Sequence, residues 1–186
     1  LRQPGLRPVC FYSPYEAAIW AILSQRVQMR QAANLKDRLR ETFGELVGIH
    51  GQPMRAFPSP EALLGVQTFP GVFASKISSL HAVARAALEG QLDAAYLRSL
   101  SDDEALRHLR SLSGIGPFSA ELILLRGAGH SDYLTLLEPR FRQAVATAYR
   151  LDSLPSDDDL RHLSDRWRPY RMWVTFLLRQ SSETRS

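Results

Sequence analysis

Signals for the start of a helix recur along the chain, and they constrain its fold more than any other feature. Ser-Pro pairs at 13–14 and 59–60 each join an N-cap hydroxyl to a proline, which fits the first turn of a helix. Ser101 and Glu104 have the spacing of a capping box ahead of an apolar helical repeat. No stretch shows the sustained alternation of a strand, so we expect an all-α chain of about ten short helices.

Apolar residues are frequent enough for a buried core. The chain has 186 residues, of which 45% are hydrophobic, so we expect one compact domain or two small lobes. Its longest apolar runs, at 17–23 and 172–178, fall short of the roughly 20 residues that a membrane helix needs. These runs are typical of core helices, and we expect no membrane partner.

The single cysteine, Cys10, bounds the redox chemistry. It excludes an internal disulfide and an iron–sulfur cluster held by four cysteines. A reducing compartment fits best, and we expect the cytoplasm, close to the bacterial nucleoid. No basic leader followed by an apolar stretch opens the sequence, so we expect no secretory signal. Residue 1 is Leu rather than Met, which leaves an upstream domain open.

The charge balance is basic. The formal net charge is +4, and Lys36 and Lys76 are the only lysines, so the basic side is almost all arginine. Arginine forks suit phosphate oxygens, as expected of a nucleic-acid binder. A genome-wide preference for arginine accounts for the composition equally well. The acidic stretch 152–159 is either a metal cluster or a helix cap, and we favour the cap because Ser156 precedes three aspartates.

Residues 112–121 carry most of the functional argument, with the sequence Leu-Ser-Gly-Ile-Gly-Pro-Phe-Ser-Ala-Glu. Gly114 and Gly116 permit positive φ and leave no side chain in the way of a ligand. Pro117 fits the first turn of the second helix, whose free N–H groups point outward at the turn. Such a corner suits a phosphate, so Ser113 and the two glycines are candidate DNA-binding residues.

This glycine turn is also compatible with two different roles. A plain connector between helices uses glycine as well, although Ile115 at the tip, flanked by glycines, makes a connector less attractive. A dinucleotide-binding loop fits less well, because Ser119 occupies the position of the third glycine and no strand precedes the motif. We therefore include Ile115 in the candidate DNA-binding hairpin.

Together with other blocks, the hairpin resembles the helix-hairpin-helix DNA glycosylase superfamily, most closely its bacterial 3-methyladenine DNA glycosylase II branch. The resemblance covers nearly the whole chain. Its remaining blocks follow in the family's order: Tyr15-Glu16 through Leu23-Ser24-Gln25, then Ala74-Ser75-Lys76 with Gly90-Gln91-Leu92, and Trp167-Arg168-Pro169-Tyr170-Arg171.

The resemblance implies two helical lobes around a cleft, with the hairpin gripping the DNA backbone. We expect residues 1–186 to form this core, one lobe from about 1–28 with 138–186 and the other from about 29–137. The hairpin would span 101–127. The expected partner is double-stranded DNA with a damaged base, bound by a monomer.

The resemblance implies no required cofactor. In the family, carbonyl groups of the hairpin often hold a monovalent cation, Na⁺ or K⁺. Here those carbonyls would belong to Arg110, Leu112 and Ile115.

A glycosylase extrudes its target nucleotide and reads the base by aromatic contact and edge hydrogen bonds. From the family's blocks we expect the base pocket to include Tyr12, Gln25, Phe118, Trp167 and Tyr170. Ordinary core packing is the alternative for each aromatic ring.

The resemblance places the catalytic carboxylate at Glu138, where the family has aspartate. A carboxylate there would stabilise positive charge on the sugar in the transition state. The alternative is an N-cap, since Pro139 follows as at the start of a helix. Asp132 is a second acid, and its place before Tyr133 suggests a structural cap.

Two further expectations concern Phe118 and Arg26. Phe118 stands where related lyases carry their Schiff-base lysine, so we expect hydrolysis without cleavage of the DNA backbone. Arg26 follows Gln25 in the turn that plugs the duplex in related enzymes; it is either this wedge or a phosphate contact.

The expected function is hydrolysis of the N-glycosidic bond of a damaged, alkylated purine in base-excision repair. The alternative is a catalytically weak or inactive protein that binds damaged or distorted DNA.

Overall fold

The computed structural model describes residues 5–183, and these divide into two compact units. The larger unit is Phe11–Ala128, and the smaller comprises residues 5–10 and 129–183. Helices dominate both, which confirms the all-α expectation. The boundaries differ from the expected lobes. Residues 11–28 lie in the larger unit, because their helix is apolar on most of its surface and packs there.

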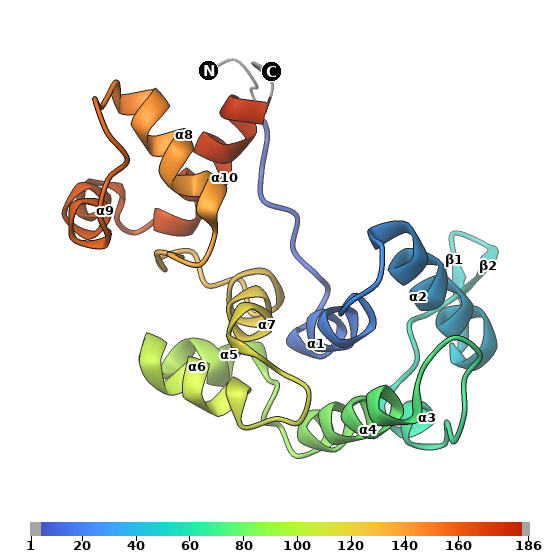
Figure 1. Cartoon of the computed structure of the whole chain (residues 1–186). Helices are drawn as coiled ribbons and strands as arrows, with labels where there is room; N and C mark the ends of the chain where they lie inside the picture. Colours follow the sequence, from blue (N-terminus) through green and yellow to red (C-terminus); the bar gives the residue numbers. More distant parts are fainter. Residues whose placement is uncertain (1–4, 184–186) are drawn as a thin grey trace. The chain divides into compact units, whose positions relative to one another are not determined.

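In the larger unit, α1 (Pro14–Leu23) is the central helix. Ala17, Ala18, Ile19 and Leu23 are fully buried along it. Figure 1 shows α1 among α2, α4 and α7, each of which contacts it. The surrounding elements are α2 (Met29–Phe43), α3 (Pro60–Leu64), α4 (Ala74–Leu88), α5 (Ala94–Ser99), α6 (Asp102–Arg110), α7 (Pro117–Leu122) and the π-helical η1 (Ile123–Gly127).

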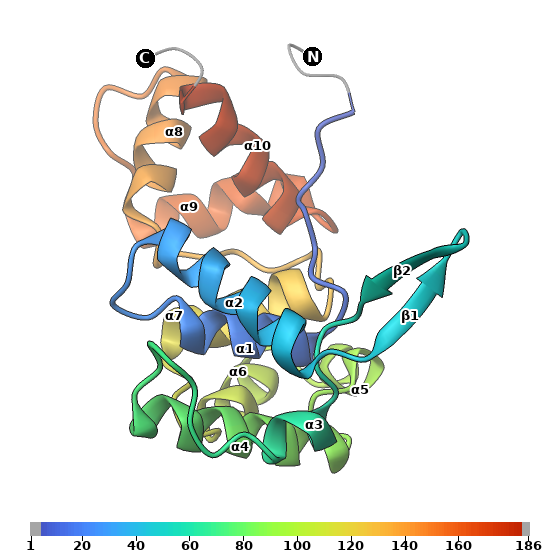
Figure 2. The same ribbon diagram turned by 90° about the vertical axis from the view of Figure 1, so that its right-hand side faces the viewer.

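A two-stranded hairpin departs from the purely helical expectation. Strand β1 (Leu46–Ile49) pairs antiparallel with β2 (Gln52–Arg55) around a His50-Gly51 turn, where both residues have positive φ, 50° and 77°. Figure 2 shows the hairpin projecting from the helices of its unit. All but one of its strand residues are exposed, so the hairpin lacks the apolar face that a sequence pattern would reveal.

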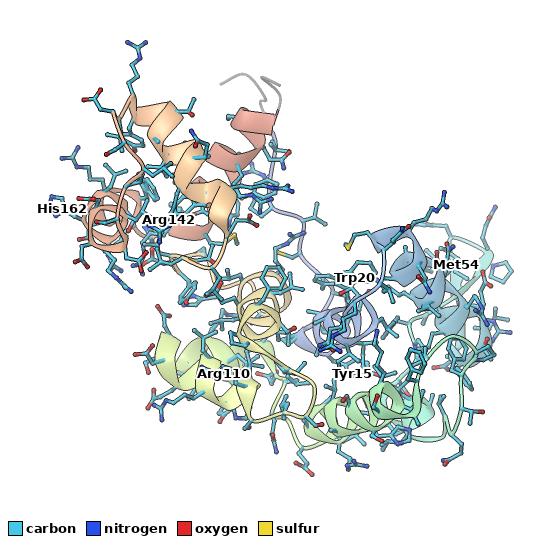
Figure 3. All side chains as sticks on the ribbon, in the orientation of Figure 1. Tyr15, Trp20, Met54, Arg110, Arg142 and His162 are labelled. Atoms are coloured by element: carbon cyan, nitrogen blue, oxygen red, sulfur yellow. The ribbon has the colours of Figure 1, made fainter. Side chains whose placement is uncertain are left out.

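The smaller unit packs α8 (Pro139–Tyr149) against α10 (Arg171–Glu183), with α9 (Asp157–Ser164) and the short η2 (Asp165–Trp167) completing it. In Figure 3, Arg142 extends from α8 toward α9, where it donates to the Pro155 carbonyl at 2.8 Å and pairs with Asp157. Five buried side chains form its core: Leu134, Phe141, Val145, Leu160 and Trp167.

The predicted helix caps are confirmed. The hydroxyls of Ser13 and Ser59 accept N–H bonds at the starts of α1 and α3. Ser101 forms a full capping box with Glu104. Ser156 forms another with Asp159, which confirms that the acidic stretch caps a helix.

Metal clusters and membrane spans are both absent from the described part of the chain. Within residues 5–183, no cluster of three or more His, Cys, Asp or Glu side chains is placed to hold a metal ion. Over the same residues, every helix is too short or too polar to cross a membrane.

Candidate functional site

The turn between α6 and α7 presents backbone rather than side chain to solvent. Gly114 has φ +84° and is exposed, as are Ser113 and Gly116. Ile115 does the opposite. Its side chain is only 6% exposed, and its N–H donates to the Leu112 carbonyl at 3.1 Å. The expectation that Ile115 reaches DNA is therefore corrected: the side chain anchors the turn in the core.

The start of α7 lacks a side-chain cap. Gly116 occupies the N-cap position with extended backbone and provides no side-chain acceptor for the first N–H groups of the helix. Phe118, in the first turn, is 63% exposed. The exposed amides and the aromatic ring make this corner able to meet an anionic strand.

The proposed cation site at the hairpin stays a prediction. Of its three carbonyls, that of Leu112 already accepts the Ile115 N–H. A carbonyl oxygen has two lone pairs, so this bond leaves one for an ion.

The turn that follows α1 lies against the hairpin. The Gln25 side-chain amide donates to the Gly114 carbonyl at 2.7 Å. Arg26, the next residue, is exposed with φ +55°, an uncommon conformation for a residue with a Cβ. The structure thus brings the expected wedge residue next to the expected DNA-binding turn. Gln25, expected in the base pocket, links the two.

Lys76, which sequence reasoning did not single out, supports this turn from α4. Its ammonium donates to the carbonyls of Leu23, at 3.1 Å, and Gln25, at 2.8 Å. Burial lowers the pKa of this ammonium from its ordinary value. One feature of the sequence could have drawn attention to this residue: it is a lysine in a chain whose basic residues are nearly all arginine.

The expected pocket aromatics have different environments. Tyr12, in the larger unit, is 97% exposed. Tyr170, in the smaller unit, is half-exposed beside Trp173. Trp167 is 8% exposed, packs edge-on against Phe141 and donates its indole N–H to the Tyr149 hydroxyl at 2.9 Å. Its expected pocket role is corrected, because both the ring and its polar atom are used in the core.

Glu138 is the N-cap of α8. One carboxylate oxygen accepts the Arg140 N–H at 3.4 Å, and the other lies 3.2 Å from the Arg179 guanidinium. Its side chain retains 22% exposure. The N-cap interpretation is confirmed. The catalytic role of Glu138 stays a prediction, since a carboxylate that caps a helix can still face a reacting group.

Asp132 joins the loop before α8 to the start of α10. Its carboxylate accepts from Arg171 at 2.8 Å and from Arg168 at 2.9 Å, and Arg171 also donates to the Asp132 carbonyl at 2.6 Å. Burial raises the pKa of Asp132, but the hydrogen bonds and charge of Arg171 and the charge of Arg168 hold it below its usual value. Asp132 is therefore an ion-paired loop residue rather than the helix cap that its place before Tyr133 suggested.

Two relatives illustrate what the sequence is similar to. DNA-3-methyladenine glycosylase 2 of Escherichia coli is 26% identical over 180 residues, covering 92% of this chain and 59% of the relative. DNA-3-methyladenine glycosylase 1 of Schizosaccharomyces pombe is 25% identical over 175 residues, covering 91% and 73%. The chain spans 59% to 62% of the length of three bacterial relatives. No family model matches it.

Solved structures match the fold. The 3-methyladenine DNA glycosylase of Archaeoglobus fulgidus aligns with a TM-score of 0.72 and 24% identity, covering 96% of this chain and 61% of that one. The Schizosaccharomyces pombe 3-methyladenine DNA glycosylase in complex with abasic DNA aligns with a TM-score of 0.65 and 25% identity, covering 97% and 85%. This chain is therefore similar to the DNA-3-methyladenine glycosylases over most of its length, at low identity, and has the helix-hairpin-helix glycosylase fold.

Proposed function

We propose that this chain is a DNA glycosylase that hydrolyses the N-glycosidic bond of an alkylated purine in double-stranded DNA. The observation that carries the proposal is the joined pair of exposed turns, in which Gln25 bonds the carbonyl of Gly114. Relatives named DNA-3-methyladenine glycosylase support the choice of reaction.

The larger unit supplies the residues that would hold the duplex. The exposed backbone at Gly114 and Gly116 would meet a phosphate of the strand. Arg26 would enter the space left by the extruded nucleotide, since its planar guanidinium can stack on bases. Phe118, where related lyases have lysine, would leave the reaction as simple hydrolysis and release an abasic site.

Glu138, in the smaller unit, is the candidate catalytic carboxylate. Breaking the bond from C1′ to the base nitrogen places positive charge on the sugar, and the bonding electrons leave with the base. Glu138 would stabilise that charge while water adds its hydroxyl to C1′ and its proton goes to the released base. The cap bond from Arg140 and the ion pair with Arg179 hold the carboxylate in place.

A base-release assay tests this function. The protein is incubated with methylated duplex DNA, and free bases are separated and counted over time. We expect Glu138→Gln to lower the release rate by about 100-fold, the usual size of such an electrostatic contribution. The matched control is Glu41→Gln, at an exposed position of α2, which should leave the rate unchanged. Undiminished release by Glu138→Gln would contradict the catalytic assignment.

A second candidate function is recognition of damaged DNA without chemistry. The Glu138–Arg179 pair favours it, because a carboxylate already paired with a cation stabilises a sugar cation less. The same assay separates the two functions. Tight binding of methylated duplex without base release would establish the second.

A further inference from the structure

Both lysines of the chain reach α1, but at opposite ends and for different partners. Lys36, on α2, forms an ion pair of 2.5 Å with Glu16 near the start of α1. Lys76, on α4, reaches the other end and finds only backbone carbonyls there, those of Leu23 and Gln25. A helix leaves its last carbonyls without helical partners, and its dipole makes that end attractive to a cation.

Lys76 connects α4 to the hairpin indirectly, through Gln25. The carbonyl of Gln25 receives the ammonium of Lys76, and the side chain of Gln25 donates to the carbonyl of Gly114. One residue of the turn thus connects the helix behind it to the hairpin beside it.

Ser79 provides a second contact between α4 and the hairpin, one helical turn after Lys76. A Cβ built on Gly114 would lie 2.6 Å from the Ser79 hydroxyl oxygen, so the hairpin backbone rests directly on α4. The same face of α4 therefore supports both exposed turns.

The supported turn includes a residue in an uncommon conformation. Arg26 has φ +55° and is exposed, and this backbone conformation costs free energy in a residue with a Cβ. Such a conformation persists only where the surroundings determine it, and the carbonyl immediately before Arg26 is the one that Lys76 holds.

We propose that Lys76 is a positioning residue that holds Arg26 in register with the hairpin, so that Arg26 can take the place of an extruded base. The proposal rests on the proposed function and deepens it. Lys76 touches no substrate. Its effect is confined to the step in which a paired base leaves the stack.

This role differs measurably from mere support of α1. Extrusion costs most for a well-paired base and least for a base that has no partner. Loss of the positioning residue should therefore slow base release from a methylated base opposite its normal partner far more than from the same base opposite an abasic analogue. A defect of the fold alone would slow both equally.

The test compares Lys76→Met with Lys36→Met on the two duplexes. Methionine keeps much of the length and removes the charge in each case. For Lys76→Met we expect release from the paired target to fall about tenfold, the scale of lost bonds to a charged group, and release from the unpaired target to fall less than about threefold. Lys36→Met should show no difference between the targets. Equal loss on both, or none, would overturn the proposal.

Gln25→Met provides a second variant, which leaves Lys76 in place. It cuts the link to Gly114 and should reproduce the preference for the unpaired target. The combined variant with Lys76→Met should lose less than the product of the single effects, because both act on one turn. If the combined variant lost as much as the product of the two single rate reductions, the two residues would not share a role. Thermal unfolding of each variant identifies any that fail to fold.

A fluorescent base separates this proposal from the proposed function. The fluorescence of 2-aminopurine placed at the target position rises when the base leaves the stack. A rise with the wild type that shrinks in Lys76→Met, without any base release, would support positioning and contradict hydrolysis. No rise with the wild type would overturn the positioning role.

Discussion

The two units hold their candidate residues by different kinds of contact. In the larger unit, Lys76 and Gln25 both donate to backbone carbonyls, so their bonds fix the path of two turns. In the smaller unit, arginines pair with the carboxylates of Glu138 and Asp132, so their bonds fix charges. Bonds to carbonyls need no ionised acceptor, whereas ion pairs depend on a deprotonated acid. The turns of Gln25 and Gly114 should therefore respond to changes of backbone shape, whereas the contacts of Glu138 and Asp132 should weaken in acid.

Gly114→Ala should have the largest effect on stability. Alanine at φ +84° is strained, and its Cβ would overlap Ser79, so we expect a loss of about 3 kcal/mol in the free energy of unfolding. DNA affinity should fall as well, because the hairpin can no longer rest on α4. Denaturant unfolding and binding to a duplex measure the two effects.

Two glycines serve as controls for Gly114. Gly90 has φ +76° with open space around it, so Gly90→Ala isolates the strain and should cost about 1 kcal/mol. Gly116 has negative φ and open space, so Gly116→Ala should leave stability nearly unchanged while its methyl group weakens the approach of DNA. If Gly114→Ala cost no more than Gly90→Ala, the contact with Ser79 would be unimportant.

Asp132→Asn tests the charge-based half of the comparison. Removing the charge that Arg168 and Arg171 share should cost about 2 kcal/mol near neutral pH, the scale of hydrogen bonds between charged groups. The measurement is unfolding by denaturant across a pH series.

The sign of the pH dependence follows from the depressed pKa of Asp132. A carboxyl with a lower pKa when folded adds stability that is fully present above its unfolded pKa, near 3.8, and is lost as the pH falls through the folded pKa. The difference between wild type and Asp132→Asn should therefore shrink in acid. A difference that stayed constant to low pH would show that the ion pairs contribute nothing.

The capping serines should give smaller effects than Asp132→Asn, and they compare the two units directly. Ser101→Ala and Ser156→Ala each remove a capping box, at α6 and α9, and should each cost about 1 kcal/mol. Amide hydrogen exchange should rise in α6 for the first variant and in α9 for the second. Faster exchange throughout both units in either variant would argue against two separately stabilised regions.

Local signals in the sequence were sufficient to predict where these four helices begin. Ser13, Ser59, Ser101 and Ser156 were all predicted as caps, since a cap depends on residues within one turn of each other. The β-hairpin was missed because its exposed strands have no apolar face. The catalytic role of Glu138 and the wedge role of Arg26 stay predictions.

Positions that depend on distant residues were predicted less well. Ile115 and Trp167 were assigned to recognition from their place in motifs, but both are buried, because the space facing each is filled by residues far along the chain or in other elements. Lys76 could not be assigned at all, since its partners lie 51 and 53 residues away.

By itself, the amino-acid sequence determined the helical class, most helix starts and the glycine turn, because backbone preferences and caps act over a few residues. The tertiary structure decided which of these features meet: that Gln25 bonds the hairpin, that Lys76 holds the turn of Arg26, and that arginines pair with Glu138 and Asp132. Those contacts join residues far apart in the chain, and only the packing of the helices brings them within hydrogen-bond distance.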